Sequence, residues 1–213
     1  MPPTRTLSAA DLRRRLAGTL PPANPTDVMM PPGSERWPGD LRQRLAGTLT
    51  PAGVLVPVLD RRGEELRLLF TERAAELRSH AGQISFPGGR MEAADTDILA
   101  TALRETHEEI GIDRDQVSVL GFLEPMPTLT GYAITPVVGL VADGARLRID
   151  AAEVASAFEV PLTFLADPAN RRVREREVRG RRMALTEFEY DGHRIWGATA
   201  FIVLQFLDQI KIK

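Results

Sequence analysis

Three glutamates in a short segment of the chain have the spacing of a metal site. Residues 103–112 read LRETHEEIGI, which places Glu105, Glu108 and Glu109 at positions i, i+3 and i+4. On a helix these positions share one face, where like charges repel each other. Mg²⁺ or Mn²⁺, which prefer oxygen ligands, would remove that repulsion. The segment therefore predicts a Mg²⁺ or Mn²⁺ site with these three carboxylates as ligands.

A glycine pair upstream adds to this prediction. Gly88 and Gly89 let the backbone approach a ligand closely, and the carbonyl of Gly89 could be a further metal ligand. A cation held there would bridge the carboxylates and a pyrophosphate and would activate a water as the nucleophile. Arg104 is expected to hold the glutamates by bidentate pairing. The alternative is a solvated acidic helix face, which the glycine pair and the order of the residues disfavour.

The glutamates require a helix to position them, and the pattern predicts one over residues 97–110. Asp95 or Thr96 is expected to cap its start, and Gly111 to end it. Apolar or small residues recur with helical spacing and form its buried stripe: Ile98, Leu99, Ala102, Leu103, Thr106 and Ile110.

Strands are predicted on both sides of this helix. They cover residues 52–59, 65–71, 117–124, 134–142, 173–178, 182–190 and 193–196. Residues 72–85 read as a loop or short helix, 153–158 and 162–166 as short helical pieces, and 199–210 as a terminal helix. This order predicts an α+β fold, an α/β/α sandwich with a central mixed sheet.

The N-terminal part contains an internal repeat. Residues 11–20 read DLRRRLAGTL and residues 40–49 read DLRQRLAGTL, with a Pro-rich linker between them. Each copy could form a short amphipathic helix with an Asp N-cap and a buried leucine pair. We expect one copy to be docked and the other loose; a dimerisation or swapping arm is the alternative. Residues 1–39 are thus interpreted as a Pro-rich, partly flexible extension, and 40–213 as the catalytic domain.

Composition excludes several classes of function. The chain has 213 residues and a net charge of -2, which gives no general attraction to nucleic acid or to an anionic membrane. It contains no cysteine, which excludes disulfides and thiolate chemistry. It lacks a stretch of about 20 apolar residues and the apolar core of a secretion signal. A soluble cytoplasmic protein is expected.

The acidic segment resembles the Nudix box, G-x5-E-x7-R-E-U-x-E-E-x-G-U, where U is a bulky apolar residue. The second half matches at Arg104, Glu105, Glu108, Glu109, Gly111 and Ile112, with Thr106 in place of one apolar residue. The first half departs from the pattern, because Gly89 comes one residue too early. Asp95 or Asp97 is the candidate for the missing glutamate. The resemblance implies a Nudix fold and metal-dependent hydrolysis, with Arg104 and the three glutamates as catalytic residues.

This departure resembles the box of one Nudix subfamily, the coenzyme A pyrophosphatases, which also have one extra residue after the glycine and an Asp in place of the glutamate. Their upstream pattern is L-L-T-x-R followed by L-R-x-H-x-G-Q-[IV]-S-F-P-G-G. Residues 69–73 of this chain read LFTER and residues 77–89 read LRSHAGQISFPGG, and the similarity extends over about residues 51–207. It implies cleavage of coenzyme A to 4′-phosphopantetheine and adenosine 3′,5′-bisphosphate. Acyl and oxidised coenzyme A are further candidate substrates.

The resemblance also implies a set of substrate-binding residues, namely Arg73, Arg78, His80, Gln83, Gly88 and Gly89. The arginines would supply bidentate donors to phosphate groups. His80 and Gln83 could instead only brace the loop through backbone hydrogen bonds.

Three further features have less specific interpretations. Glu153 is a weak candidate for the general base or a metal contact, and a surface or capping carboxylate is favoured. The charged run at residues 171–177 is interpreted as a solvated edge strand rather than a phosphate contact. Trp196 and Phe201 are assigned to the core rather than to ligand stacking.

Two alternative functions stay open. One is a Nudix hydrolase of ADP-ribose, NADH or another nucleoside diphosphate derivative. The other is a non-catalytic Nudix module that senses a nucleotide or binds a partner, although such modules typically lose the box glutamates. The expected partner is a small molecule, with no nucleic acid and no membrane, and a homodimer is left open.

Overall fold

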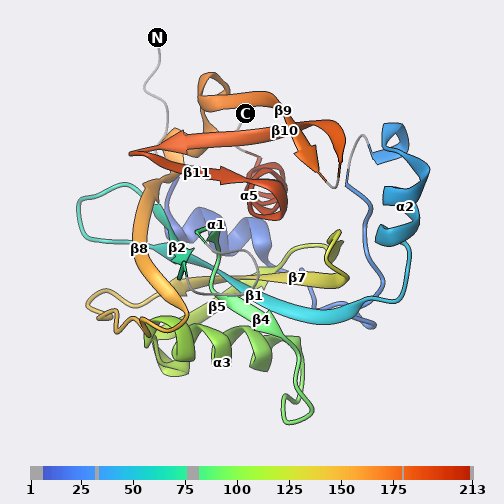
Figure 1. Ribbon diagram of the computed structural model, residues 1–213. Coiled ribbons are helices and arrows are strands. Elements are labelled where there is room, and N and C mark those ends of the chain that lie inside the picture. Colours follow the sequence, from blue (N-terminus) through green and yellow to red (C-terminus); the bar gives the residue numbers. More distant parts are fainter. Residues whose placement is uncertain (1–6, 32–33, 76–81, 179, 212–213) are drawn as a thin grey trace.

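An eight-stranded mixed sheet forms the centre of the protein (Figure 1). The computed structural model describes residues 7–31, 34–75, 82–178 and 180–211. The strand order is β3-β2-β1-β7-β5, with β4 paired to β1, β6 to β7 and β8 to β2. The strands are β1 (Thr50–Leu59), β2 (Arg67–Arg73), β3 (Ile84–Ser85), β4 (Gly88–Arg90), β5 (Val117–Phe122), β6 (Met126–Pro127), β7 (Tyr132–Val141) and β8 (Val154–Pro161).

The parallel pair β1 and β7 lies in the middle of this sheet. The two strands are in register from Thr50 opposite Tyr132 to Leu59 opposite Val141. Residues 52–58 of β1 are buried without alternation. A continuous apolar run of this kind is typical of a strand that is covered on both faces.

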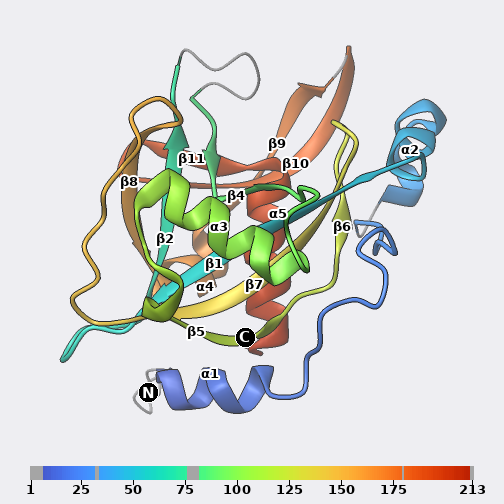
Figure 2. The same cartoon turned by 90° about the horizontal axis from the view of Figure 1, so that it is seen from below.

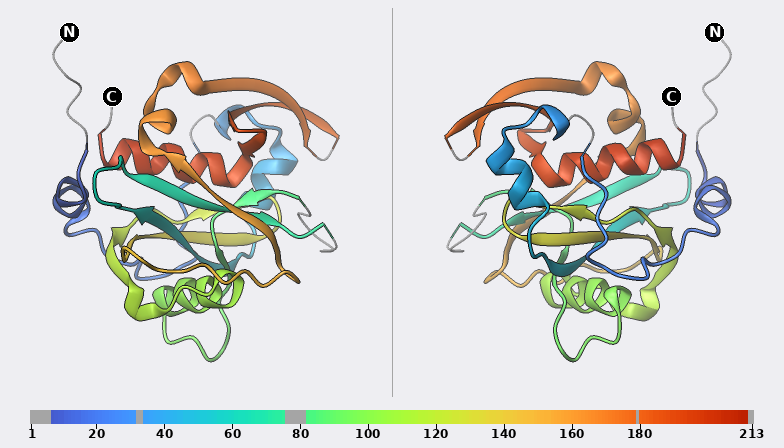
Figure 3. Two further views of the ribbon diagram at one scale, coloured as in Figure 1. Left: turned by 90° about the vertical axis from the view of Figure 1, so that its left-hand side faces the viewer. Right: turned by 90° about the vertical axis from the view of Figure 1, so that its right-hand side faces the viewer.

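Helices cover the two faces of the sheet, as Figures 1 and 3 show. Helix α3 (Ile98–Ile110) lies on one face, and helix α5 (Gly197–Gln209) lies on the other. A three-stranded antiparallel sheet, formed by β9 (Arg171–Val178), β10 (Arg181–Tyr190) and β11 (His193–Trp196), lies beyond α5. The predicted α/β/α sandwich with a mixed sheet is confirmed, and the second small sheet extends it. Short helical segments are α4 (Leu162–Ala166), η1 (Ser34–Arg36), η2 (Arg114–Gln116) and η3 (Pro168–Asn170).

The main core lies between the large sheet and α5. Phe70 from β2, Phe188 from β10 and Phe206 from α5 are fully buried members of it. Truncation of such a side chain to alanine typically costs about 3–5 kcal/mol. A smaller cluster under α3 joins that helix to the other face of the sheet through Leu55, Ala102 and Val137. The smaller cluster holds α3 in a fixed position on the sheet.

Several sequence predictions about secondary structure are wrong, including the loop or short helix at residues 72–85, whose ends belong to β2 and β3. Residues 154–158, predicted as helical, belong to β8, which pairs antiparallel with β2 from Arg67 opposite Pro161 to Arg73 opposite Val154. Alanine and glutamate favour a helix locally, but pairing with a strand distant in sequence decides the outcome. The cap of α3 is Asp97, whose carboxylate accepts a hydrogen bond of 2.7 Å from the amide of Ala100, and not Asp95 or Thr96.

The first copy of the repeat forms α1 (Ala9–Leu16), which packs at the β5 edge of the sheet (Figure 2). Its N-cap is Ser8, in a capping box with Asp11, so the predicted Asp cap is wrong. Leu12 and Leu16 are fully buried in the main core. After the helix, the hydroxyl of Thr19 accepts a hydrogen bond of 2.9 Å from the amide of Phe122 on β5.

The second copy forms α2 (Gly39–Leu45), and residue Pro38, not Asp40, stands at its cap position. Leu41 and Leu45 are both buried. The expectation that one copy is loose is therefore wrong for residues 39–45, since both leucine pairs are removed from solvent. Among the described residues, no helix combines the length and the apolar character that crossing a membrane requires.

Candidate active site

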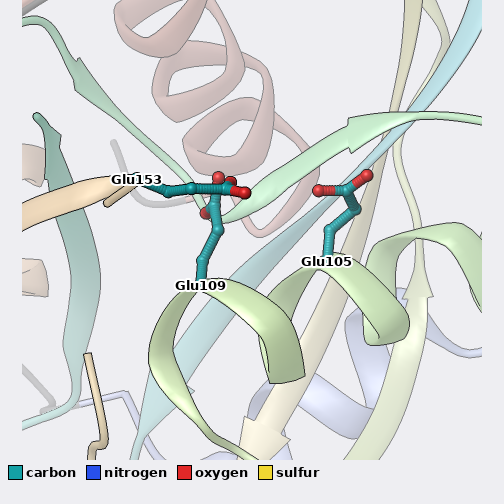
Figure 4. A group of neighbouring side chains, drawn as sticks. All are labelled: Glu105, Glu109 and Glu153. Carbon is teal, nitrogen blue, oxygen red and sulfur yellow. The ribbon is translucent and has the colours of Figure 1, made fainter. Parts of the chain in front are cut away.

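Close packing of α3 against β1 sets the position of the glutamates. A Cβ atom at Gly53 of β1 would lie 2.5 Å from the carbonyl oxygen of Ile98. Only glycine therefore allows the helix to approach the strand this closely. The helix ends at Gly111, which adopts the left-handed conformation with φ 72°. Between these points α3 presents Glu105 and Glu109 toward β4 and the start of β8 (Figure 4).

Three carboxylates meet at this position: Glu105 and Glu109 from α3 and Glu153 from the turn before β8 (Figure 4). Each offers one oxygen, and these oxygens all lie within 4.8 Å of one another. Glu109 is 2% exposed. Three carboxylates so close together repel one another unless protons or a cation neutralise them. A hard divalent cation with oxygen ligands fits this donor set.

The carboxylates also show the electrostatic signature of such a site. Burial raises the pKa of Glu109 to about 8, and the neighbouring Glu105 and Glu153 act in the same direction. Burial likewise raises the pKa of Glu105. Arg73 opposes the shift at Glu109, with Nη1 3.5 Å from Oε1 of the carboxylate. Arg73 and Arg104, which pairs with Glu105 at 2.9 Å, do not balance three carboxylates, so the site favours additional positive charge.

The glycine pair of β4 leaves room for these carboxylates. The amide of Gly88 donates a hydrogen bond of 3.3 Å to Oε2 of Glu109. A Cβ atom at Gly89 would lie 2.4 Å from Cδ of Glu105. Glycine at position 89 thus allows the carboxylate to lie directly against the backbone. Coordination of a metal by the Gly89 carbonyl stays a prediction.

Arg104 connects the cluster to the preceding loop. Its Nε and Nη2 donate to the two oxygens of Asp95, both at 3.0 Å, and its Nη1 donates to Glu105 and Glu108, both at 2.9 Å. The hydrogen bonds from Arg104 lower the pKa of Asp95 to about 2, and the same contacts raise the pKa of Arg104. Of the two candidates for the missing box glutamate, Asp95 contacts Arg104, whereas Asp97 caps the helix.

The structure brings together some of the predicted residues and not others. Glu108 is 51% exposed on its side chain and lies outside the three-carboxylate cluster, held by Arg104. Arg73 contacts the cluster through Glu109. Gln83 lines a cavity on the opposite face of the sheet. Arg78 and His80 lie outside the described residues.

Comparison with known proteins assigns the chain to a family. The profile described as the NUDIX domain matches residues 49–196. The chain belongs to the Nudix family. A Nudix hydrolase NudL from Photorhabdus laumondii, described as uncharacterized, is 42% identical over 159 residues, which cover 75% of this chain and 84% of the relative. A protein of the same description from Escherichia coli O6:H1 is 37% identical over 160 residues, covering 75% and 82%.

A solved structure agrees on the fold. The MutT/nudix family protein from Enterococcus faecalis aligns over 78% of this chain and 64% of its own length, with a TM-score of 0.51 and 14% identity. The chain is thus a Nudix hydrolase, of a family that acts on nucleoside diphosphate derivatives and generally uses divalent metal ions.

Glu153 is the weakest of the sequence-based candidates for this Nudix site. The favoured interpretation was a surface or capping carboxylate, yet its oxygen joins the cluster. Glu153 is not part of the box, because it lies 44 residues beyond Glu109 in the chain. The pairing of β8 with β2 and backbone hydrogen bonds from Arg148 and Asp150 to the end of α3 bring it to the cluster. The one available signal is a carboxylate directly ahead of the apolar stretch at residues 154–158.

Proposed function

We propose that this Nudix hydrolase cleaves the diphosphate of coenzyme A, yielding 4′-phosphopantetheine and adenosine 3′,5′-bisphosphate. Mg²⁺ or Mn²⁺ is the proposed cofactor. The observation that carries the reaction is the cluster of Glu105, Glu109 and Glu153 beside the Gly88–Gly89 backbone. The choice of substrate rests on residues 77–89, which resemble the pattern of the coenzyme A pyrophosphatases.

The residues of the site have separate roles in this proposal. Glu105, Glu109 and Glu153 would hold the cation. Glu108 would be a further ligand or would lie at the edge of the metal site. When bound, the cation would neutralise charge on the diphosphate and lower the pKa of a water. Arg104 is a positioning residue, because its hydrogen bonds fix Glu105 and Glu108 against Asp95. Arg73, which lies beside Glu109, would contact a phosphate oxygen.

A substrate panel tests the proposal. The purified protein with Mg²⁺ or Mn²⁺ is given coenzyme A, an acyl derivative, oxidised coenzyme A, dephospho-coenzyme A, ADP-ribose and NADH, and the products are identified. We expect the highest kcat/KM for coenzyme A or its derivatives. A strong preference for ADP-ribose or NADH would replace the proposed substrate. Failure to cleave any diphosphate would favour a nucleotide-sensing module.

A further inference from the structure

A second site faces the opposite side of the sheet from the carboxylates. An open cavity of about 660 Å³ lies between the β2–β3 end of the large sheet and the three-stranded sheet. This is within the range of small-molecule sites in proteins, roughly 300–1,000 Å³. Strand β11 contacts β3, and the hydroxyl of Thr199 donates to the carbonyl of Ile84 at 2.9 Å. These contacts fix the two walls of the cavity relative to each other.

Strand β9 supplies arginines to this cavity. Residues 172, 174 and 176 alternate along the strand and therefore share one face. Glu187 on β10 is 2% exposed and pairs with two of them, with Nε of Arg174 and Nη2 of Arg176 each 2.7 Å from its oxygens. A buried carboxylate thus orients two guanidinium groups. The solvated edge strand expected from the sequence is, on this face, one wall of a cavity.

The lining of the cavity includes three arginines, Arg174, Arg176 and Arg194, and three glutamates, Glu72, Glu187 and Glu189, but the glutamates do not use all the arginine donors. Glu189 pairs with Arg172 at 2.9 Å, and Glu72 accepts from the hydroxyl of Ser156 at 3.0 Å, with Nδ1 of His193 3.9 Å away. Arg174 uses only Nε in its ion pair. Its two terminal nitrogens have no partner among the described residues.

Arg194 and Trp196 of β11 complete the cavity wall. The guanidinium carbon of Arg194 lies 5.8 Å from the centre of the Trp196 ring. Within the described part of the chain, Arg194 has no carboxylate partner. The Trp196 side chain is only half-buried and lines the cavity, so the expected assignment to the core is wrong for this residue. An indole face beside the Arg194 guanidinium and the terminal nitrogens of Arg174 suits a nucleobase with a phosphate next to it.

The cavity and the carboxylate cluster border the same end of β2. Glu72, which lines the cavity, and Arg73, which contacts Glu109, are consecutive residues whose side chains point to opposite faces. Their Cα atoms are only about 3.8 Å apart along the chain. A ligand that reaches both sites would pass around this end of β2, with its diphosphate at the carboxylates and its nucleoside in the cavity.

We propose that this cavity binds the adenosine 3′-phosphate end of coenzyme A. Arg174 and Arg194 bind the 3′-phosphate, and Trp196 stacks on the adenine. The assignment of the ligand rests on the proposed coenzyme A pyrophosphatase activity. It would make the β9–β11 sheet the part of the protein that selects coenzyme A over nucleotides without the 3′-phosphate.

Direct binding tests this proposal without catalysis. Adenosine 3′,5′-bisphosphate and AMP are titrated into the metal-free protein by calorimetry, with Arg194→Ala, Trp196→Leu and, as a control, Arg182→Ala. Arg182 lies on β10 of the same small sheet, is 85% exposed on its side chain and does not line the cavity. Loss of a charged hydrogen-bond partner corresponds to about 10-fold to 100-fold in affinity.

We expect the wild type and Arg182→Ala to bind the bisphosphate at least about 10-fold more tightly than AMP. Arg194→Ala should lose that preference, and Trp196→Leu should weaken both ligands alike. Equal binding of the two ligands by the wild type, or an unchanged preference in Arg194→Ala, would overturn the proposal. A parallel measurement of kcat/KM separates the two hypotheses. If coenzyme A is not cleaved, the proposed activity fails, whereas cleavage with an unaltered Arg194→Ala profile rejects the cavity alone.

Discussion

Glu109→Gln should stabilise the metal-free protein and remove its response to metal. Glu109 is buried against Glu105 and Glu153, and burial raises its pKa from 4.5 to about 8. A raised pKa means that the folded state is favoured below the unfolded value and loses stability as the pH rises through the folded value. The metal-free wild type should therefore lose stability between pH 4.5 and about 8. Glutamine carries no charge but can still accept the hydrogen bond from Gly88.

The size of the effect follows from the same values. One pKa unit corresponds to about 1.4 kcal/mol, so at pH 7 the ionisation of Glu109 favours the unfolded chain, where its pKa is 4.5, by at most about 3 kcal/mol. For a chain of this size, 1 kcal/mol shifts the Tm by about 2–4 °C. Glu109→Gln should therefore raise the Tm in EDTA by up to about 10 °C. A cation at 100 times its Kd would stabilise the wild type by about 2.7 kcal/mol.

Thermal unfolding measured by calorimetry checks this prediction. Wild type, Glu109→Gln and Glu108→Gln are compared in EDTA and in Mg²⁺, near pH 7 and near pH 5. Glu108 is the matched control for stability because it lies on the same helix but is half exposed, and its substitution should change the free energy of unfolding by less than about 0.5 kcal/mol. The difference between wild type and Glu109→Gln should shrink near pH 5. A Tm of Glu109→Gln below that of the wild type in EDTA, or an equal increase in the Tm of these two proteins on addition of Mg²⁺, would refute the reasoning.

Three further substitutions test other parts of the account. Gly89→Ala should lower kcat by about 100-fold or more with little change in Tm, because its Cβ would displace the Glu105 carboxylate. The control is Gly39→Ala, where a Cβ meets nothing within 4 Å. Equal kinetics of the two variants would contradict this prediction. Asp95→Asn should cost about 1–2 kcal/mol near pH 7 by loss of the Arg104 pair. Since the pKa of Asp95 is lowered to about 2, this contribution is present above 3.8 and lost as the pH falls through about 2, so urea unfolding of the two proteins should converge in acid. Leu16→Ala should cost about 2–5 kcal/mol and Leu20→Ala almost nothing, and a neutral Leu16→Ala would mean that α1 does not contribute to the core.

Local patterns were sufficient to predict most of the elements. The helix around Glu105 has a strong 3.6-residue apolar period and a glycine stop, and it ends at Ile110 as predicted. The strand at residues 52–59 was found because β1 is apolar along its length. Residues 154–158 were misassigned because the partner that makes them a strand, β2, lies about 80 residues away in sequence. No local pattern contains that pairing.

The same distinction applies to the site. Glu105 and Glu109 were predicted because their spacing within one helix already places them together. Glu153 joins them through the register of β8 on β2 and the backbone hydrogen bonds of residues 148–150 to the end of α3. Arg194 and Trp196 face the cavity through the packing of the small sheet against β3. The role of Asp95 depends on the path of the loop between β4 and α3, which brings it to Arg104. Sequence spacing thus predicts sites within one element, and long-range packing determines the remainder.

Analysis of the products formed from coenzyme A is the most direct test of the proposed metal-dependent cleavage. Coenzyme A is incubated with the wild-type protein in Mn²⁺, with the wild type in EDTA and with Glu109→Gln in Mn²⁺, and the products are identified by mass spectrometry. We expect 4′-phosphopantetheine and adenosine 3′,5′-bisphosphate from the wild type in Mn²⁺, and a loss of at least about 100-fold in rate in the other two reactions. Intact coenzyme A in all three reactions, or equal rates in EDTA and Mn²⁺, would contradict the proposal.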